Sequence, residues 1–317
     1  MTRGRSHNCV KTGSSKLKRL RSTFINRASG RHALALFGLL VGLISPVSAH
    51  PKETLVWLLR DLPPLTIFEG PEKGQGVVDQ LMPLLIAGMP QYDHTLMRVN
   101  RARGMQMLRE ESFTCDPSLV WSKAREQWIV FSIPVFRAVS NGLVVRQEDR
   151  PELEPFLVNG EVDLAALLAS GEKKVGTVAE RSYGQFVDVL LQQAPANALT
   201  LHYGNDALGS LLQMQRLGRL LAVLGYWPEI RYLAQQEHIA DSELAFYPVK
   251  GTDTYISTYI GCSKTPQGQQ AISEINQLLR TLPHERLAHA YADWLDPQRR
   301  NDYLEQAKAF FEHPTEQ

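Results

Sequence analysis

Short apolar runs of strand length alternate along this chain with stretches whose apolar residues recur at helical spacing. In the first half, the expected strands cover residues 54–59, 95–99 and 113–116. Pro83 lies inside the first helical pattern, so we expect that helix to start late, near Asp79, or to kink. Asn100 precedes the second pattern and suits the cap of a helix that reaches about residue 111. The order β-α-β-α-β predicts an α/β fold with a parallel sheet covered by helices.

A second unit of the same kind follows a charged linker at residues 146–155. Its expected strands cover residues 174–178, 199–203 and 220–224, and its expected helices cover 163–170, a stretch capped by Ser182, and a stretch capped by Asn205 or Asp206 that ends at Gly218. A β-branched run at 254–260 then precedes three helical patterns, the first of which begins at Pro266. Two similar units in series predict two lobes.

The first 49 residues differ in composition from the rest of the chain. They hold nine Lys and Arg and no acid, then an apolar run at residues 33–44, then the small residues Val47, Ser48 and Ala49. This pattern is typical of a secretory signal peptide over residues 1–49, and the run is short for a membrane-spanning helix. A retained membrane anchor is the alternative. Because His50 rather than a cysteine follows the small residues, we do not expect a lipoprotein.

Removing this leader changes the charge of the chain. The whole sequence has 34 Lys and Arg against 33 Asp and Glu, and nine of the basic residues lie in the leader. Residues 50–317 therefore carry 34 − 9 = 25 basic residues and a net charge of −8. Such a balance argues against a nucleic-acid-binding surface.

The usual signatures of catalytic and metal sites are weak or absent. His284 and His289 are five residues apart, whereas a helical zinc pair needs a spacing of four. The chain has no G-x-S-x-G motif, and the Gly74-Gln75-Gly76 turn does not directly follow a strand as a phosphate-binding loop would. We therefore expect no metal, no cofactor and no catalytic residues.

A segment in the first unit carries a family resemblance. The order Ser122-x-x-Arg125, followed by Phe131-Ser132-x-Pro134, resembles the T-x-x-R…F-S-x-P segment of type II periplasmic solute-binding proteins of the polar-amino-acid family. The resemblance implies two lobes, each a mainly parallel sheet flanked by helices, with two crossover strands as a hinge. It implies that Arg125 clamps a ligand carboxylate, for which a guanidinium offers a planar fork of donors.

The implied organisation divides the chain into four parts. Residues 1–49 are the signal peptide, 50–140 the first part of lobe 1, 141–256 lobe 2, and 257–317 the return strand and C-terminal helices of lobe 1. In such folds, ligands bind where loops follow the carboxyl ends of the strands. The loops expected to line this cleft supply the candidate ligand-binding residues Asp61, Ser118, Trp121, Arg125, Ser182, Tyr183 and Tyr226.

Two positions in lobe 2 depart from the family pattern or match it loosely. Ser182 takes the place of the family's ligand-contacting threonine. The family's acid that holds the ligand α-amino group falls at Tyr226, so a plain α-amino acid is not the expected ligand. The aromatic residues of these loops are expected to close over an apolar or cationic part of the ligand. The only acids that the sequence places near the cleft are Asp61, Glu69 and Glu180.

The resemblance implies a periplasmic protein without enzymatic activity. It would close on a small, amino-acid-like solute with a carboxylate and deliver it, as a monomer, to an ABC permease or a sensor. One alternative is an enzyme on the same scaffold, such as a cyclohexadienyl or arogenate dehydratase. Another is a degenerate relative that binds a peptide or a cell-wall fragment.

Two cysteines persist once Cys9 leaves with the leader, and disulfides are stable in an oxidising compartment. Cys115 ends the third expected strand, and Cys262 follows the strand that returns from lobe 2. In a sheet of this topology, the two strands are neighbours, so we expect a Cys115–Cys262 disulfide. Two buried, unpaired thiols are the alternative.

Overall fold

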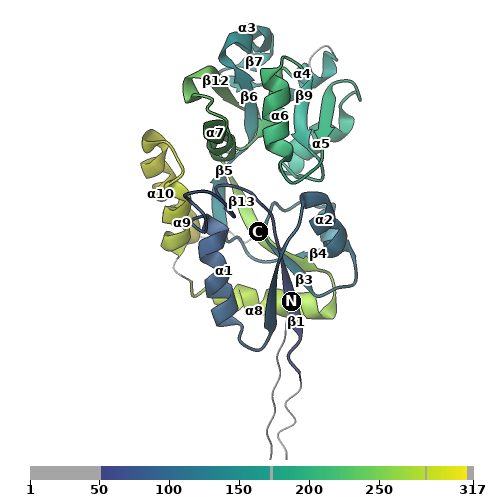
Figure 1. Cartoon of the computed structure of the whole chain (residues 1–317), viewed down its shortest axis with the longest axis vertical. Coiled ribbons are helices and arrows are strands. Elements are labelled where there is room, and N and C mark those ends of the chain that lie inside the picture. The colour runs from purple at the N-terminus through teal and green to yellow at the C-terminus, as the bar shows by residue number, and fades with distance from the viewer. Residues whose placement is uncertain (1–50, 172–173, 283, 313–317) are drawn as a thin grey trace, which may run out of the picture. The chain divides into compact units, whose positions relative to one another are not determined.

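The structure is a computed structural model that describes residues 51–171, 174–282 and 284–312 (Figure 1). The expected signal peptide, with Cys9 and the apolar run, lies outside these residues. Within the described ranges, no helix is both long and apolar enough to cross a membrane.

The first sheet contains strands from both ends of the described chain. In spatial order its strands are β2 (Asp93–Arg98), β1 (Thr54–Leu59), β3 (Thr114–Leu119), β13 (Tyr255–Ser263) and β4 (Ile129–Phe131), with β5 (Phe136–Val139) also paired to β13. The first three strands are parallel, and β13 is antiparallel to β3. We call the part of the chain built on this sheet lobe 1.

Five helices belong to lobe 1, and their apolar faces pack into its core. They are α1 (Val77–Gly88), α2 (Arg101–Arg109), α8 (Pro266–Leu279), α9 (His284–Ala292) and α10 (Pro297–Glu312). Asn100 caps α2 as expected, because its side chain accepts a hydrogen bond from the Arg103 amide. The expected late start of α1 is wrong. The Asp79 carboxylate accepts the amide of Gly76, 3.0 Å away, which stabilises a helix start ahead of Asp79.

The second sheet is built from the middle of the chain. Its spatial order is β10 (Leu199–His202), β9 (Val175–Val178), β11 (Ala222–Gly225), β6 (Gly142–Arg146) and β12 (Leu244–Pro248). Strand β9 is parallel to both β10 and β11, whereas β6 is antiparallel to β11 and β12. We call the part built on this sheet lobe 2.

The helices of lobe 2 are α3 (Arg150–Leu153), α4 (Leu164–Ala169), α5 (Gln185–Gln193), α6 (Ala207–Arg216) and α7 (Trp227–Gln236). A hairpin of β7 (Leu157–Val158) and β8 (Glu161–Val162) completes the lobe. The apolar pattern did not predict α3, this hairpin, α7 or β12, and α7 supplies a residue of the candidate site.

The chain passes between the sheets at two neighbouring places. It leaves β5 and enters β6 through Ser140 and Asn141, and it returns between β12 and β13. The Ser140 amide donates to the Thr254 carbonyl oxygen, 2.9 Å away, so the two crossings are hydrogen-bonded to each other. Helices α9 and α10 brace this region, because the hydroxyls of Tyr291 and Tyr303 bond the backbone of β5.

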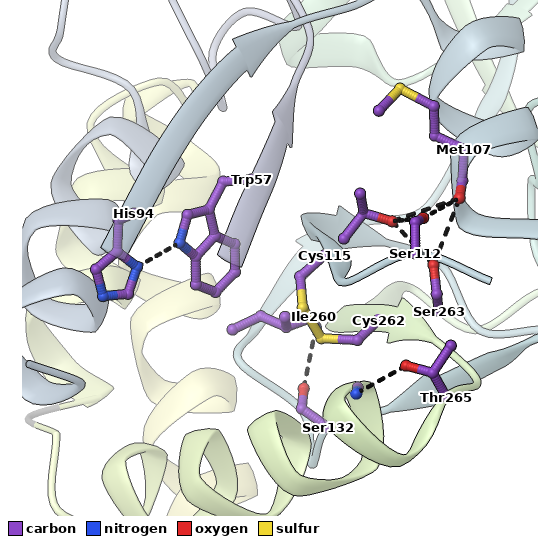
Figure 2. The surroundings of a disulfide bond; sticks show 12 residues. Trp57, His94, Met107, Ser112, Cys115, Ser132, Ile260, Cys262, Ser263 and Thr265 are labelled. Atoms are coloured by element: carbon purple, nitrogen blue, oxygen red, sulfur yellow. Dashed lines mark hydrogen bonds between the residues drawn. A yellow bond between two sulfur atoms is a disulfide. The ribbon is translucent and has the colours of Figure 1, made fainter. Parts of the chain in front are cut away.

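The predicted disulfide is confirmed. Cys115 on β3 and Cys262 on β13 lie directly opposite each other, with Cα atoms 4.0 Å apart, and both side chains are fully buried. Figure 2 shows the bridge beside a set of buried hydroxyl contacts, among them Ser132 with the amide of Ile260. The alternative of two unpaired thiols is therefore wrong, and the bridge joins the outgoing and returning segments of lobe 1.

Candidate functional site

Loops from both lobes meet around two adjoining hollows. The small cavity has a volume of about 50 Å³ and is lined by Ser118, Arg125, Ser182 and Tyr226, four of the predicted site residues. The large cleft, of about 470 Å³, is lined by a fifth, Asp61. Arg101, Arg181 and Glu229 line both hollows, and none of these three is among the predicted ligand-binding residues.

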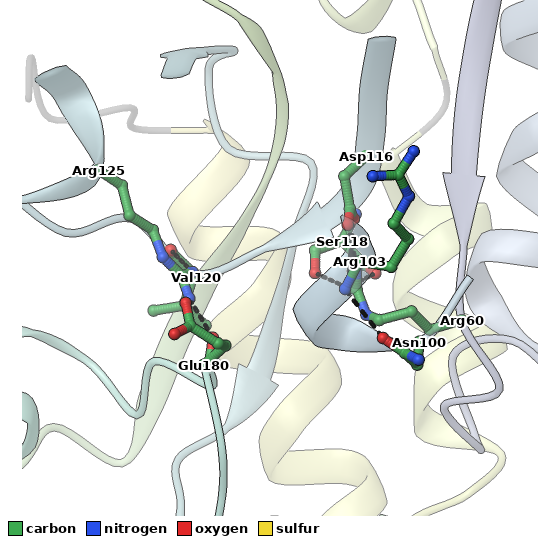
Figure 3. A network of polar contacts seen from close by, with 8 residues as sticks. All are labelled: Arg60, Asn100, Arg103, Asp116, Ser118, Val120, Arg125 and Glu180. Atoms are coloured by element: carbon green, nitrogen blue, oxygen red, sulfur yellow. Dashed lines mark hydrogen bonds and ion pairs between the residues drawn. The ribbon is translucent and has the colours of Figure 1, made fainter. Parts of the chain in front are cut away.

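Arg125 is 8% exposed and lies where the two lobes touch. Its Nη1 donates to the Val120 carbonyl oxygen at 3.0 Å, and its Nη2 donates to the Glu180 carbonyl oxygen at 2.9 Å (Figure 3). Burial lowers the pKa of Arg125, and Asp188 and Tyr226 oppose that shift. Because a guanidinium has five N–H donors, two carbonyl partners leave others for a carboxylate in the small cavity.

Ser118 is held by a buried ion pair in lobe 1. The guanidinium of Arg60 pairs with Asp116 and also donates to the Ser118 hydroxyl at 3.2 Å (Figure 3). Asp116 accepts the Ser118 amide at 3.0 Å, which fixes the end of β3. Burial, together with Arg101 and Arg125, lowers the pKa of Arg60 well below its usual value. The charge of Arg60 is therefore matched by an acid inside the protein.

The loop before α5 differs from the prediction. Ser182 does not cap this helix, which begins at Gln185. Its hydroxyl donates to Asp188 at 2.5 Å, and the Tyr183 amide donates to the same carboxylate at 2.8 Å. The Asp188 carboxylate thus lies over the start of its own helix and accepts one of the free amides there, where a negative charge is favourable. Burial raises the pKa of Asp188, and these two hydrogen bonds oppose that shift.

Three other candidates are occupied elsewhere. The hydroxyl of Tyr183 accepts the Val178 amide at 2.9 Å inside lobe 2, and the residue lines neither hollow. Trp121 also lines neither, and its Nε1 donates to Glu126 at 3.0 Å. Asp61 pairs with Arg98 at 3.1 Å on the wall of the large cleft, where burial raises its pKa against the influence of Arg98.

The acid that the sequence interpretation missed is Glu229 on α7. It forms a buried, two-armed ion pair with Arg181, in which Nη1 and Oε1 are 3.1 Å apart. Burial lowers the pKa of Arg181, but Glu229, together with Tyr183 and Tyr226, more than offsets this, so the pKa of Arg181 is raised. Pro228 at the first turn signals a helix start after β11, and that signal would have placed Glu229 at the cleft. Of the acids expected there, Glu180 lines neither hollow, and its carboxylate pairs with Arg109 instead.

The aromatic residues also have a different role from the one expected. The guanidinium of Arg181 lies 4.8 Å from the ring centre of Tyr226 and 5.6 Å from that of Tyr183. Cation–π contacts of this kind stabilise a positive charge. The place expected for a cationic part of the ligand is therefore held by a cation of the protein.

Arg101, the first residue of α2, has a different environment from the other buried arginines. Its partly buried guanidinium has no ion pair or hydrogen bond within the part of the chain that the structure describes. Burial, with the nearby charges of Arg181 and Arg125, lowers its pKa to about 9, so it stays charged at neutral pH. The hydroxyl of Tyr226 is likewise buried without a hydrogen-bond partner among the described residues.

Among the described residues, no group of three His, Cys, Asp or Glu side chains is placed to hold a metal ion. His284, one of the two histidines weighed as a zinc ligand, stacks on the ring of Phe311 with ring centres 4.0 Å apart.

No protein-family model matches the sequence, and no curated protein matches it either. Solved structures do match its fold. An amino-acid ABC transporter substrate-binding protein, AbpA from Streptococcus pneumoniae bound to L-arginine, aligns over 77% of this chain and 94% of its own, with a TM-score of 0.55 and 16% identity. The periplasmic VFT2 domain of BvgS from Bordetella pertussis aligns over 78% and 94%, with a TM-score of 0.55 and 20% identity.

A histidine kinase sensor domain with similarity to periplasmic binding proteins gives a TM-score of 0.59 at 14% identity and covers 78% of this chain and 96% of its own. This chain has the two-lobed fold of type II periplasmic binding proteins. At these identities the likeness extends to the fold alone. The type II binding-protein fold places the small cavity and the large cleft at the loops that follow the strand ends, the usual ligand position in open α/β sheets.

Proposed function

We propose that this protein is a periplasmic solute-binding protein that closes on a small, carboxylate-bearing solute and delivers it to an ABC permease or a sensor. The basic and apolar leader at residues 1–49 supports export to the periplasm. Solved proteins of the same fold, described as a transporter substrate-binding protein and as a kinase sensor domain, support the two kinds of partner.

The observation that carries this proposal is the position of Arg125. It is buried on the wall of the small cavity, and it already bonds lobe 2 through the Glu180 carbonyl oxygen. A carboxylate bound to the remaining N–H groups would share that guanidinium with both lobes, so binding and closure of the lobes are coupled. The single arginine thereby explains both recognition and closure.

The dimensions of the hollows set how such a solute lies. Small-molecule sites usually measure about 300–1,000 Å³, so the small cavity of about 50 Å³ is too small for a whole solute. The adjoining large cleft, of about 470 Å³, takes the rest of the solute. Leu62 and Pro63 line both hollows and offer an apolar contact where they adjoin.

An enzyme of the dehydratase type is the rival on this scaffold, and it needs a free acid or base beside the leaving group. Glu229 is the one carboxylate among the described residues that lines the small cavity, and both of its oxygens are held by Arg181. This arrangement favours binding over acid–base catalysis.

The experiment is a thermal-shift screen of the purified protein against amino acids, peptides and organic acids, with each hit measured by calorimetry and checked for turnover. We expect Arg125→Ala to weaken binding of a carboxylate hit by about 2–4 kcal/mol, because one partner of a buried charge pair is removed. Arg103→Ala, at an exposed arginine paired with Glu110, is the matched control and should bind normally.

Unchanged affinity in Arg125→Ala would contradict the proposal, provided that the variant melts as a folded protein. Conversion of a hit into a product would favour the enzyme instead. Hits confined to peptides or cell-wall fragments would favour a degenerate binding protein.

A further inference from the structure

The arginines around the two hollows fall into two groups. Arg60 pairs with Asp116, Arg98 with Asp61 and Glu69, and Arg181 with Glu229, so the charges of these three are matched by acids of the protein. Arg125 bonds only carbonyl oxygens, and Arg101 bonds nothing in the described chain. A partly buried guanidinium loses hydrogen bonds to water, and without an acceptor in the protein it does not regain them. An anionic ligand would supply these hydrogen bonds and remove the cost in free energy.

The hydroxyl of Tyr226 is a second, independent sign of a missing acceptor. It is buried on the wall of the small cavity and has no partner among the described residues. Three other oxygen-bearing side chains that line the same cavity have hydrogen-bond partners of their own. The Ser182 hydroxyl bonds Asp188, the Ser118 hydroxyl accepts from Arg60, and the Glu229 carboxylate is held by Arg181.

The charge of the small cavity follows from its lining. Arg101, Arg125 and Arg181 face a single carboxylate, that of Glu229, so the ionised side chains on its wall sum to two positive charges. One carboxylate at Arg125 would neutralise only half of this excess. The remaining positive charge is associated with Arg101. This residue also lines the large cleft, into which the rest of the solute would extend.

We infer that Arg101 and the Tyr226 hydroxyl form a second anion subsite beside Arg125, and that the solute is a small dianion such as a dicarboxylate. This inference rests on the proposed function and names the chemical class of its ligand. The first carboxylate binds Arg125, and the second negative group binds Arg101 and accepts from the tyrosine.

The walls of the small cavity disfavour an ammonium or guanidinium of the ligand at this end. Such a group needs a free carboxylate, and the Glu229 carboxylate is bound on both oxygens by Arg181, which also occupies the aromatic face of Tyr226. A cationic solute would face like charges from Arg101, Arg125 and Arg181. The inferred ligand is therefore a dicarboxylate without a free α-amino group, unlike the L-arginine of the AbpA structure.

Calorimetry with matched pairs of solutes tests this subsite. The probes are the linear dicarboxylates from malonate to adipate, each compared with its own monoamide, which keeps the length and one carboxylate. We expect the wild-type protein to bind at least one diacid ten-fold or more tightly than its monoamide. Arg101→Gln should weaken that diacid ten-fold or more and its monoamide less than three-fold.

Two further variants sharpen the result. Arg103→Gln, on the same helix but exposed and paired with Glu110, should leave both affinities unchanged. Tyr226→Phe removes only the hydroxyl that donates to the second negative group. It should therefore weaken binding of the diacid more than binding of the monoamide.

Equal affinity for a diacid and its monoamide, or equal weakening of both by Arg101→Gln, would overturn the second subsite while leaving the Arg125 carboxylate site intact. Failure of every diacid and every monoamide to bind would overturn the second subsite, whereas the Arg125 carboxylate site is overturned by unchanged affinity of Arg125→Ala for a carboxylate from the wider screen.

Discussion

The two lobes line the small cavity with arginines in different states. Lobe 1 contributes Arg101 and Arg125, which have no carboxylate partner within the described residues. Lobe 2 contributes Arg181, which is paired with Glu229 and stacked on Tyr226. Under the proposed function, lobe 1 would supply the positive charge that a solute neutralises, and lobe 2 would close over the solute with a wall whose charges are already balanced.

The lobes also differ in how they are held together. Lobe 1 has the Cys115–Cys262 bridge across its two central strands, and the described part of lobe 2 has no cysteine. Both lobes bury an arginine–carboxylate pair, for which the cost of desolvation often cancels much of the attraction. The disulfide is therefore the clearest stabilising difference between the lobes.

The largest expected effect on stability comes from removing the disulfide. The bridge closes a loop with a sequence separation of 147, for which the chain-entropy model gives roughly 5 kcal/mol as an upper figure. We expect Cys115→Ala with Cys262→Ala to lower the urea midpoint of unfolding by a corresponding amount. Amide exchange should rise in β3 and β13 more than in β9 and β11. An unchanged midpoint, or equal exchange in both sheets, would mean that the bridge does not distinguish the lobes.

The next effect concerns the pair in lobe 2. Glu229→Gln leaves Arg181 buried without its counter-charge, and such changes cost about 3–5 kcal/mol. Chemical denaturation should show this loss in the variant. The matched control replaces both partners, as Arg181→Met with Glu229→Leu, and should recover most of the stability. If Glu229→Gln were as stable as the wild type, the lobe 2 wall would not depend on this pair.

The smallest effect is expected for Arg101→Gln in the absence of any solute. This change removes a charge that has no partner and that lies near Arg125 and Arg181, so stability should stay within about 1 kcal/mol of the wild type or rise slightly. The same denaturation experiment measures it. A loss comparable to that of Glu229→Gln would show that Arg101 has a structural role, and the contrast between the lobes would fail.

The sequence predicted the fold better than the site. Apolar runs located β1 and the helices capped by Asn100 and Asp206, because burial and capping act over a few neighbouring residues. The family-like segment around Arg125 led to the small cavity. The disulfide followed from strand order, which is set by the topology of the lobe and not by local spacing.

The missed features depend on contacts between distant segments. Arg101, Arg181 and Glu229 come from three separate loops or helix starts, and no periodic pattern shows that they share a cavity. The failed cap at Ser182 has a local cause instead, because the nearby Asp188 carboxylate accepts both the Ser182 hydroxyl and the Tyr183 amide. Helix α7 was not predicted, although Pro228 lies in its first turn. Proline interrupts the interior of a helix but is favourable at this position.

A crystal structure of the protein with a solute from the screen tests the central claim most directly. We expect the solute carboxylate to lie in the small cavity with its oxygens about 2.7–3.2 Å from the guanidinium nitrogens of Arg125, in contact with both lobes. A solute bound elsewhere, with Arg125 bonded only to the carbonyl oxygens of Val120 and Glu180, would contradict it.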